Sequence, residues 1–302
     1  MLFSILIANY NNGHFFKDCY QSIIAQTYDN WEVIIVDDCS TDDSVVVIKQ
    51  IIGDDNRFKI FLNKENNGCG YTKNRCAQLA QGEILGFLDP DDALTNNALE
   101  LMVNAHRKHK DVAIITSKHE LVDLEMNFIS NSLYGSTVPE NKSYLTHGSG
   151  ALTHFATFKQ YKYLQSAGID TMMKRAVDQD LYYKMEEQGR HLFIDKVLYQ
   201  YRIHDNSISC NDNLYKAEYW HFYAINKAFK RRKRQKMLID NFTKQYMKVY
   251  CSNYYLSRFA KLKFTEKSKA KYYFLCEAFF SNPLHEFKLK IKSLILLMLR
   301  RI

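Results

Sequence analysis

The chain has 302 residues, of which 46% are hydrophobic and 25% charged, and this suits one large domain with an appendage or two domains. No apolar run reaches the roughly 18 residues of a membrane-spanning helix, so the composition argues against an integral membrane protein. The net charge of +8 is uneven, because residues 206–302 carry 21 Lys and Arg against 6 Asp and Glu (net +15), whereas residues 1–205 carry 20 against 27 (net −7). This asymmetry predicts two domains, 1–205 and 206–302.

The seven cysteines are scattered along the chain, and no two of them form a CxxC pair. An odd number of dispersed cysteines is typical of a reduced protein and argues against both a disulfide framework and a zinc cluster. A cytoplasmic location is therefore expected.

Strands and helices alternate through the first 116 residues. Apolar runs predict strands at residues 3–8, 31–36, 58–62, 84–88 and 112–116. Helical spacing of apolar side chains predicts helices between them, at residues 15–26, 44–52, 70–80 and 97–109. Because the strands are almost wholly apolar, we expect an α/β fold with a mostly parallel, Rossmann-like sheet and helices on both of its faces.

The pattern weakens after this repeat. Residues 121–152 are loop-rich, residues 180–187 predict a helix, and residues 197–203 predict a strand. The region after residue 206 is predicted to be helical, and it is basic and rich in tyrosine.

Clusters of acidic residues follow two of the predicted strands: Asp37 and Asp38 after one, and Asp89, Asp91 and Asp92 after the other. Ligands of parallel α/β sheets bind beyond the carboxyl ends of the strands, so a site is expected there. Three carboxylates crowded at a strand end are costly unless neutralised, and a divalent cation that also bridges phosphates would neutralise them. The alternative is helix capping, for which Asp92 is the natural candidate.

Asp37 and Asp38 also have two interpretations. They cap the turn at residues 41–44, or they accept hydrogen bonds from the base or ribose of a bound nucleotide. Neither GxGxxG nor GxxxxGK[ST] occurs in the chain, so the dinucleotide fingerprint and the P-loop are both absent.

Three blocks of sequence, in order over residues 1–209, carry a family resemblance. They are SILIANYNNGHFFKDCYQSIIAQTYDNWEVIIVDDCSTDDS, NNGCGYTKNRCAQLAQGEILGFLDPDD and AVDQDLYYKMEEQGRHLFIDKVLYQYRIHDNSIS. Together they resemble the inverting glycosyltransferases of family two, which have the GT-A fold. The C-terminal hundred residues are not covered by the resemblance.

The resemblance implies a role for individual positions. It assigns the nucleotide-sugar to Ala8, Tyr10, Asp38, Lys73 and Asp89. It assigns a divalent metal to Asp91 and a metal or diphosphate contact to His204. Asp178 occupies the position of the catalytic base.

The chain departs from the family pattern at several positions. Ala8 stands where Pro or Thr is usual, and Lys73 stands where Arg is usual. The other departures are Cys39 and Cys76 for glycines, Pro90 for a small residue, and Val177 for the Glu before the base. These changes bear on nucleotide choice and the acceptor side, because the metal and base aspartates are intact.

The two aspartates of the third block require a choice. Both Asp178 and Asp180 are placed to cap the helix predicted at 180–187; we assign Asp180 as the cap and Asp178 as the base. For His204 the alternative to a metal ligand is a solvated histidine at a strand end. A histidine beside carboxylates would favour Mn²⁺ over Mg²⁺.

The basic C-terminal region carries two further features. Residues 230–236 (KRRKRQK) form a solvated helix face, a nucleic-acid patch or a lipid-headgroup patch. Within residues 285–302, a helix would align an apolar stripe beside lysines: Phe287, Ile291, Leu294, Ile295, Met298 and Ile302. We expect this helix to bind an anionic membrane surface; the alternatives are a helix docked on the protein's own core and, for the alternating FKLKIK, a short strand.

These features together predict a cytoplasmic, peripheral-membrane, non-processive inverting glycosyltransferase. It would use a UDP-sugar, a divalent metal (Mn²⁺ or Mg²⁺) and a glycan or lipid-linked acceptor, as in surface polysaccharide biosynthesis. The alternatives are a non-catalytic nucleotide-sugar binder and a nucleic-acid-binding protein that uses the basic tail. No nucleic-acid partner is expected, because the first region is acidic and no recognition motif is present.

Overall fold

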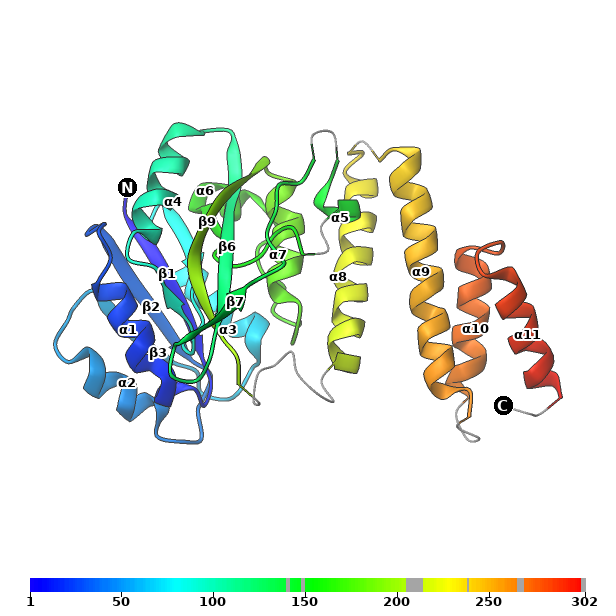
Figure 1. Ribbon diagram of the computed structural model, residues 1–302, viewed down its shortest axis with the longest axis horizontal. Coiled ribbons are helices and arrows are strands. Elements are labelled where there is room, and N and C mark those ends of the chain that lie inside the picture. The colour runs from blue at the N-terminus through cyan, green and yellow to red at the C-terminus, as the bar shows by residue number, and fades with distance from the viewer. Residues whose placement is uncertain (140–141, 148–149, 205–213, 238, 265–268, 300–302) are drawn as a thin grey trace. The chain divides into compact units, whose positions relative to one another are not determined.

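The computed structural model describes residues 1–139, 142–147, 150–204, 214–237, 239–264 and 269–299 (Figure 1). The chain divides into two compact units, residues 1–225 and 226–302. The boundary predicted near residue 205 falls next to residues 205–213, which lie outside the described residues.

Four strands form the first half of the sheet: β1 (Phe3–Asn9), β2 (Trp31–Asp37), β3 (Phe58–Leu62) and β4 (Ile84–Phe87). They lie in the order β3-β2-β1-β4, and every neighbouring pair is parallel. The apolar runs form these strands because both faces of the sheet are covered, and β2 is buried along its whole length. Since the strands are parallel, their acidic carboxyl ends lie at one edge.

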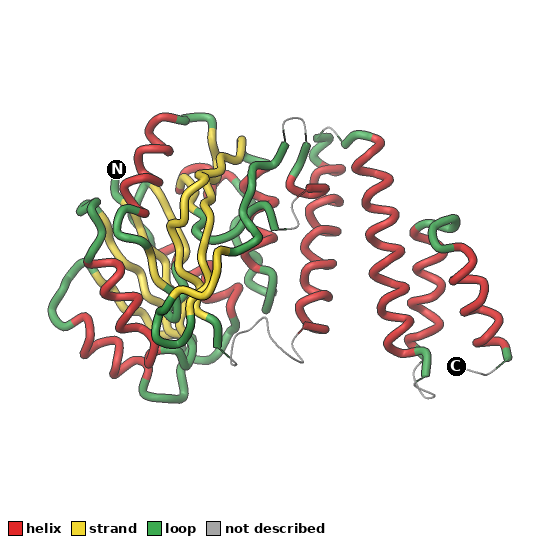
Figure 2. The backbone as a smooth tube through the Cα atoms, viewed as in Figure 1, coloured by secondary structure: helices red, strands yellow, loops and turns green. Residues whose placement is uncertain are grey.

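Helices connect these strands and cover the sheet (Figure 2). They are α1 (Phe16–Ile24), α2 (Ser44–Ile52), α3 (Cys69–Leu79) and α4 (Ala98–Lys108), with a 3₁₀ turn η1 (Gly13–Phe15) before α1. Helix α1 buries Phe16, Cys19 and Ile23, spaced at helical intervals, in the core shared with β1. The four predicted helices are therefore confirmed, with ends shifted by at most two residues.

The second half of the sheet is mixed. It contains β5 (Ala93–Leu94), β6 (Val112–Val122), β7 (Phe128–Asn131), β8 (Thr157–Lys159) and β9 (Arg190–Arg202). Strands β6 and β9 are parallel. Strand β8 lies between β4 and β6 and is antiparallel to both. Strand β5 pairs antiparallel with β9, and β7 pairs antiparallel with β6. The predicted α/β class is confirmed, whereas the expected parallel arrangement holds for β1–β4 and for β6 with β9.

Three shorter helices belong to this half: α5 (Tyr144–His147), α6 (Gln160–Gln165) and α7 (Val177–Glu186). Helix α7 starts three residues before the predicted residue 180, directly after Ala176, and no side chain caps its first turn. The prediction that Asp180 caps this helix is therefore wrong. Asp180 lies inside the first turn, is 1% exposed, and forms an ion pair of 2.5 Å with Lys184.

The C-terminal region is helical, as predicted, with α8 (Leu214–Arg234), α9 (Asn241–Leu262), α10 (Ala270–Ser281) and α11 (Phe287–Met298). Leu256, Phe259, Leu275, Ala278 and Leu297 form the apolar core of α9, α10 and α11. Residues 287–292 are helical, which excludes the short strand considered for FKLKIK. None of the helices that the structure describes combines the length and apolar character needed to cross a membrane.

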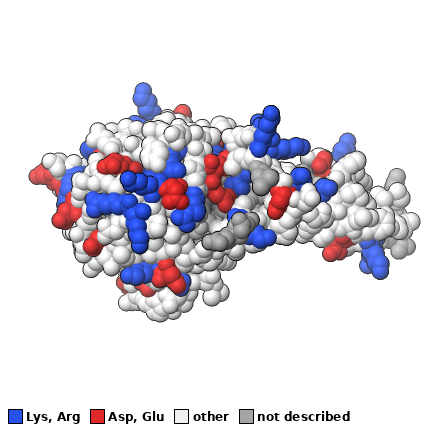
Figure 3. All heavy atoms as spheres, turned by 90° about the horizontal axis from the view of Figure 1, so that it is seen from above, with Lys and Arg blue, Asp and Glu red and all other residues white. Residues whose placement is uncertain are grey.

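Charged side chains of both signs occur on the face drawn in Figure 3. Among the described residues on that face, basic and acidic groups are interspersed and do not merge into one continuous basic surface. This face therefore does not show the clustered positive charge that the nucleic-acid alternative requires.

Candidate active site

The carboxyl ends of three neighbouring parallel strands define one edge of the sheet. Strand β1 lies between β2 and β4. Strand β2 ends at Asp37, β1 ends at Asn9, and β4 is followed directly by Leu88 and Asp89. The two acidic clusters are therefore brought to the same edge, as the sequence predicts.

The two aspartates after β2 have different partners. Asp37 accepts hydrogen bonds from the backbone N–H (2.8 Å) and hydroxyl (2.5 Å) of Ser40, directly before the turn at residues 41–44, whose Ser44 N–H is capped by Asp42 instead (3.0 Å). Asp38 accepts from the side-chain amide of Asn63 (2.6 Å) and from the backbone N–H groups of Asn67 (3.0 Å) and Gly68 (2.7 Å). Asp38 thus fixes the loop that leads into α3.

A second network joins the loop after β1 to the loop after β2. Asn11 donates its backbone N–H to the Ser40 hydroxyl (2.9 Å), and its side-chain oxygen accepts from the N–H of Thr41 (2.8 Å). The buried Ser44 hydroxyl accepts from the N–H of Gly13 (2.9 Å). Asn11, Ser40 and Ser44 were not singled out from the sequence, although they belong to the first family-like block. They hold the two loops that flank Tyr10.

The resemblance assigns Tyr10 to the nucleotide base and Ala8 to the nucleotide-sugar. Ala8 is paired with Val36 in the sheet, and Tyr10 follows the end of β1 with 44% of its surface exposed. An exposed aromatic ring at a strand end is available to a flat ligand. Both assignments remain predictions.

Lys73 and Asp89 form an ion pair with an Nζ–Oδ1 distance of 3.0 Å. Burial alone would raise the pKa of Asp89, but the charge of Lys73 holds that pKa below its ordinary value. Burial by itself would lower the pKa of Lys73. The neighbouring acidic groups, of which Asp89 has the largest effect, outweigh burial and raise the pKa of Lys73. Both groups are therefore charged at neutral pH, and 31% of the Asp89 side chain stays exposed.

This ion pair lies in a pocket that also contains Asp178. The lining residues are Lys73, Phe87, Asp89, His154, Ala156, Phe158, Ile169, Val177, Asp178, Leu181 and Tyr182. Asp178 lies in the first turn of α7 and is exposed. The structure thus brings together Lys73, Asp89 and Asp178, although Asp178 lies 105 positions after Lys73 and 89 after Asp89.

Close packing of α3 against the segment before α7 makes this meeting possible. Gly70 donates its backbone N–H to the carbonyl of Met173 (3.0 Å). A Cβ at position 70 would lie 2.5 Å from the carbonyl oxygens of Asp170 and Met173. Only glycine permits this approach, which positions Lys73 one turn further along α3 beside Asp178.

Asp91 and His204 form a second pair, with 2.9 Å between Asp91 Oδ2 and His204 Nε2. The imidazole is 6% exposed and packs against the ring of Phe15 at 5.0 Å. The alternative of a solvated strand-end histidine is therefore wrong. The two residues predicted to hold a metal are adjacent, although 113 positions separate them.

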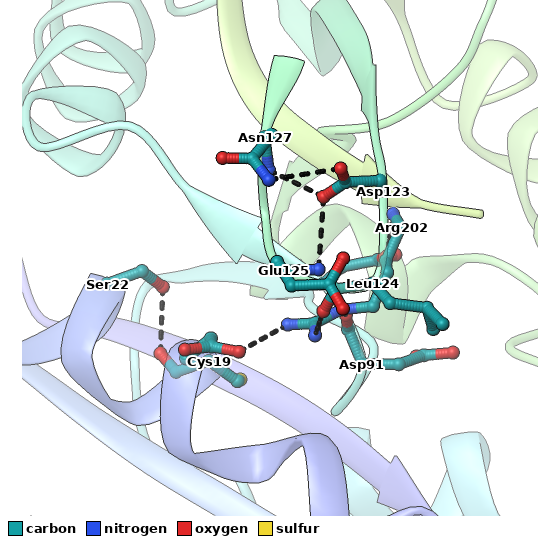
Figure 4. Close-up of polar contacts among 10 residues, drawn as sticks. Cys19, Ser22, Asp91, Asp123, Leu124, Glu125, Asn127 and Arg202 are labelled. Carbon is teal, nitrogen blue, oxygen red and sulfur yellow. Dashed lines mark hydrogen bonds and ion pairs between the residues drawn. The ribbon is translucent and has the colours of Figure 1, made fainter. Parts of the chain in front are cut away.

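Arg202 holds the backbone around this pair (Figure 4). Its guanidinium donates to the carbonyls of Asp91 (2.8 Å) and Leu124 (2.6 Å) and pairs with Asp18 of α1 at 2.6 Å. It joins the loop after β4, the turn between β6 and β7, and α1. Because this arginine is 2% exposed, removing it would leave buried carbonyls without donors.

Asp92 has a structural environment that differs from the capping expected for it. Its carboxylate accepts from the Tyr199 hydroxyl (2.6 Å) and the Arg202 backbone N–H (2.8 Å), and Asn97 occupies the position before α4. Burial first, and then the charges of Asp91 and Asp89, raise its pKa well above the ordinary value. The prediction that Asp92 caps a helix is wrong: it attaches the acidic loop to β9.

The Asp91–His204 pair suits a divalent cation that is shared with a substrate. Within the described ranges, no group of three or more His, Cys, Asp or Glu side chains is arranged to hold a metal ion. Mg²⁺-type cations are commonly bound by one or two protein ligands together with substrate phosphates and water. One carboxylate and one imidazole that face each other across 2.9 Å fit such a shared site.

Comparison with known proteins decides the family. The model of "Glycosyl transferase family 2" matches residues 4–163, more than half of the chain. The chain belongs to glycosyl transferase family 2. This membership confirms the predicted family and class of enzyme.

Curated relatives are similar over most of this chain. It is 30% identical to a chondroitin synthase of Escherichia coli over 230 residues, which are 76% of this chain and 33% of that protein. It is also 30% identical to a hyaluronan synthase of Pasteurella multocida over 233 residues, which are 76% of this chain and 23% of that protein. The chain thus spans about a quarter to a third of the length of these relatives.

Solved structures share the fold. S. aureus TarS residues 1–349, in complex with UDP-GlcNAc, superposes with a TM-score of 0.69 at 17% identity, covering 96% of this chain and 85% of that one. The same fragment in complex with UDP gives a TM-score of 0.66 at 19% identity, covering 94% of this chain and 81% of that one. The GT-A fold expected from the resemblance is confirmed.

Proposed function

We propose that this protein transfers a sugar from a UDP-sugar to a hydroxyl of a glycan or lipid-linked glycan, with inversion at the anomeric carbon. The observation that carries the proposal is the pocket that joins the Lys73–Asp89 pair to the exposed carboxylate of Asp178. The first two groups are assigned to the donor and the third to the base. Their convergence in one pocket is what a single displacement requires.

The reaction assigned to these residues is a single step. Asp178 accepts the proton of the acceptor hydroxyl as the oxygen attacks the anomeric carbon from the face opposite the diphosphate. A bond forms between the acceptor oxygen and that carbon while the bond from the carbon to the diphosphate oxygen breaks. The products are the glycoside, UDP and the protonated Asp178, which returns its proton to water.

The leaving diphosphate requires positive charge. Asp91 and His204 would hold a divalent cation, Mn²⁺ or Mg²⁺, which when bound supplies charge that stabilises the diphosphate. Lys73, which pairs with Asp89, would contribute a fixed positive charge. Asp38 and Tyr10 would contact the nucleoside, from the loops that Asn11 and Ser40 hold together.

The choice of donor and acceptor rests on the relatives. TarS structures contain UDP and UDP-GlcNAc, and the similar curated proteins are named chondroitin synthase and hyaluronan synthase. These names support a UDP-sugar donor and a glycan acceptor in polysaccharide biosynthesis. A single transfer per encounter is proposed, as predicted from the sequence.

A membrane-surface role is proposed for α11. Its inward side buries Lys290, Ser293 and Leu297, so part of the helix docks on the helical unit as one alternative expected. The other side leaves an apolar stripe with Phe287 50% exposed, Ile295 49% and Met298 71%. Lys288 and Lys292 flank this stripe, a pattern that suits an anionic lipid surface on the cytoplasmic face.

The proposed function is tested by hydrolysis of a panel of nucleotide-sugars. The purified protein is incubated with UDP-glucose, UDP-GlcNAc, GDP-mannose and CMP-linked sugar in the presence of Mn²⁺, and the released nucleotide is measured. Release of UDP from one or more UDP-sugars, abolished by chelation of the metal, is expected. Nucleotide binding without any release would favour the non-catalytic binder.

A further inference from the structure

His154 contributes a chemically active group to the pocket that the sequence did not reveal. It precedes β8 by three positions and lines the pocket together with Lys73, Asp89 and Asp178. It belongs to none of the three family-like blocks. It shares one pocket with the donor-side ion pair and the proposed base.

The imidazole of His154 is held in place by stacking. Its ring stacks on Tyr199 with centroids 4.9 Å apart and on Tyr201 at 5.7 Å, with interplanar angles of 20° and 25°. The ring of His119 meets it edge-on at 5.9 Å. Tyr199 is itself fixed by its hydrogen bond to Asp92. The ring therefore has a defined orientation before any ligand binds.

The polar atoms of this ring are available to a ligand. No hydrogen bond joins a His154 ring nitrogen to any other residue within the part of the chain that the structure describes. Burial lowers its pKa, although the charges of Asp89 and Asp178 act in the opposite direction. A neutral imidazole offers one N–H donor and one nitrogen acceptor, the pair of functions that matches a sugar hydroxyl.

We propose that His154 is a specificity-determining residue that hydrogen-bonds the transferred sugar ring of the donor. The inference rests on the proposed function. The donor is assigned to Lys73 and Asp89, and the attacking hydroxyl to Asp178, so the transferred sugar is expected between these groups. His154 faces that space with unpartnered ring nitrogens, and an uncharged group there distinguishes sugars by their hydroxyls without competing for the diphosphate.

The test compares affinity for UDP with affinity for UDP-GlcNAc, measured by calorimetry with Mn²⁺ present. His154→Phe keeps a ring that can stack on Tyr199 and Tyr201 but removes both polar atoms. His154→Gln keeps a donor and an acceptor and loses the stack. His119→Phe is the matched control, because it makes the same change one ring further away, at a buried histidine outside the pocket lining.

The expected result is selective. His154→Phe should weaken UDP-GlcNAc binding about tenfold, the effect of losing one or two hydrogen bonds, and should change UDP affinity less than twofold. His154→Gln should recover part of the loss, and His119→Phe should bind both ligands like the parent.

Two results would overturn the inference and leave the proposed function intact. One is unchanged UDP-GlcNAc affinity in His154→Phe, which would move the residue to the acceptor side or to a packing role. The other is an equal loss for UDP and UDP-GlcNAc, which would indicate a distorted pocket. A parent protein that binds neither ligand would refute the proposed function, and the inference with it.

Discussion

The two compact units use their charged residues in different ways. In residues 1–225, charged side chains from different elements meet in pairs: Asp89 pairs with Lys73, and Asp91 lies against His204. In residues 226–302 the basic residues are many and include the run at 230–236, and one of them, Lys290, is buried and donates to the carbonyl of Asn282 at 2.6 Å. The comparison teaches that the location of a site follows from which charges meet, and that net charge by itself does not locate one.

The largest effect is expected from substitution of Asp178, the proposed base. Asp178→Asn should reduce turnover by roughly 10²–10⁴-fold, the usual contribution of a general base, and should leave UDP affinity unchanged because this exposed side chain is not assigned to the donor. Steady-state kinetics and calorimetry on the same preparation measure the two quantities. Asp54→Asn, at an exposed aspartate on a distant turn, is the control. Retained turnover, or a parallel loss of UDP binding, would assign Asp178 another role.

A smaller effect is expected at the Asp91–His204 pair. Asp91→Asn should weaken Mn²⁺-dependent UDP binding more than tenfold, because it removes a hard oxygen ligand and leaves the diphosphate charge unbalanced. His204→Ala should act in the same direction, whereas metal-independent UDP binding should stay as in the parent. Titration of UDP with and without Mn²⁺ separates metal-dependent from metal-independent UDP binding. Equal metal dependence in parent and variants would place the cation elsewhere.

The smallest effect is expected in the helical unit. Ile295→Glu puts a charge into the exposed stripe of α11 and should lower partitioning onto anionic liposomes about fivefold, since about half of an isoleucine side chain no longer enters the interface. Liposome co-sedimentation measures the bound fraction.

The control for the stripe is Leu164→Glu, which replaces an apolar residue that is 70% exposed on α6 of the first unit. It should sediment with liposomes like the parent. Hydrolysis of the donor should be unaffected in both variants. If the two variants sediment equally, the stripe does not contact lipid and the helical unit has a different surface role.

The elements that the sequence predicted well share a local cause. Strands β1, β2 and β4 are short apolar runs buried on both faces, and each ends where polar residues begin, so pattern alone locates them. The adjacency of β2, β1 and β4 then follows from parallel pairing, which brings the acidic ends together. Asp89 and Asp91 could be singled out for this reason, whereas Asp178 was assigned only through the family resemblance.

The features that the sequence missed depend on distant partners. Asp92 was expected to cap a helix, but its partners Tyr199 and Arg202 come from β9, more than a hundred residues away. Asp180 was expected to be a cap and is instead buried and paired with Lys184 of the same helix, whose Nζ also donates to the carbonyl of Gly168 outside the helix (2.6 Å). His154 precedes a strand of three residues, too short to give a periodic signal. Tertiary contacts decide the role of each of these side chains, so local pattern does not reveal it.

The central claim is that the pocket of Lys73, Asp89 and Asp178 transfers a sugar by a single inverting displacement. The most direct measurement follows the anomeric proton by NMR while the protein converts UDP-GlcNAc, whose sugar is α-linked, before the released sugar equilibrates in water. The proposed mechanism predicts that the first product carries the β configuration and that Asp178→Asn suppresses its formation. A first product in the α configuration, or conversion at the parental rate in Asp178→Asn, would contradict it.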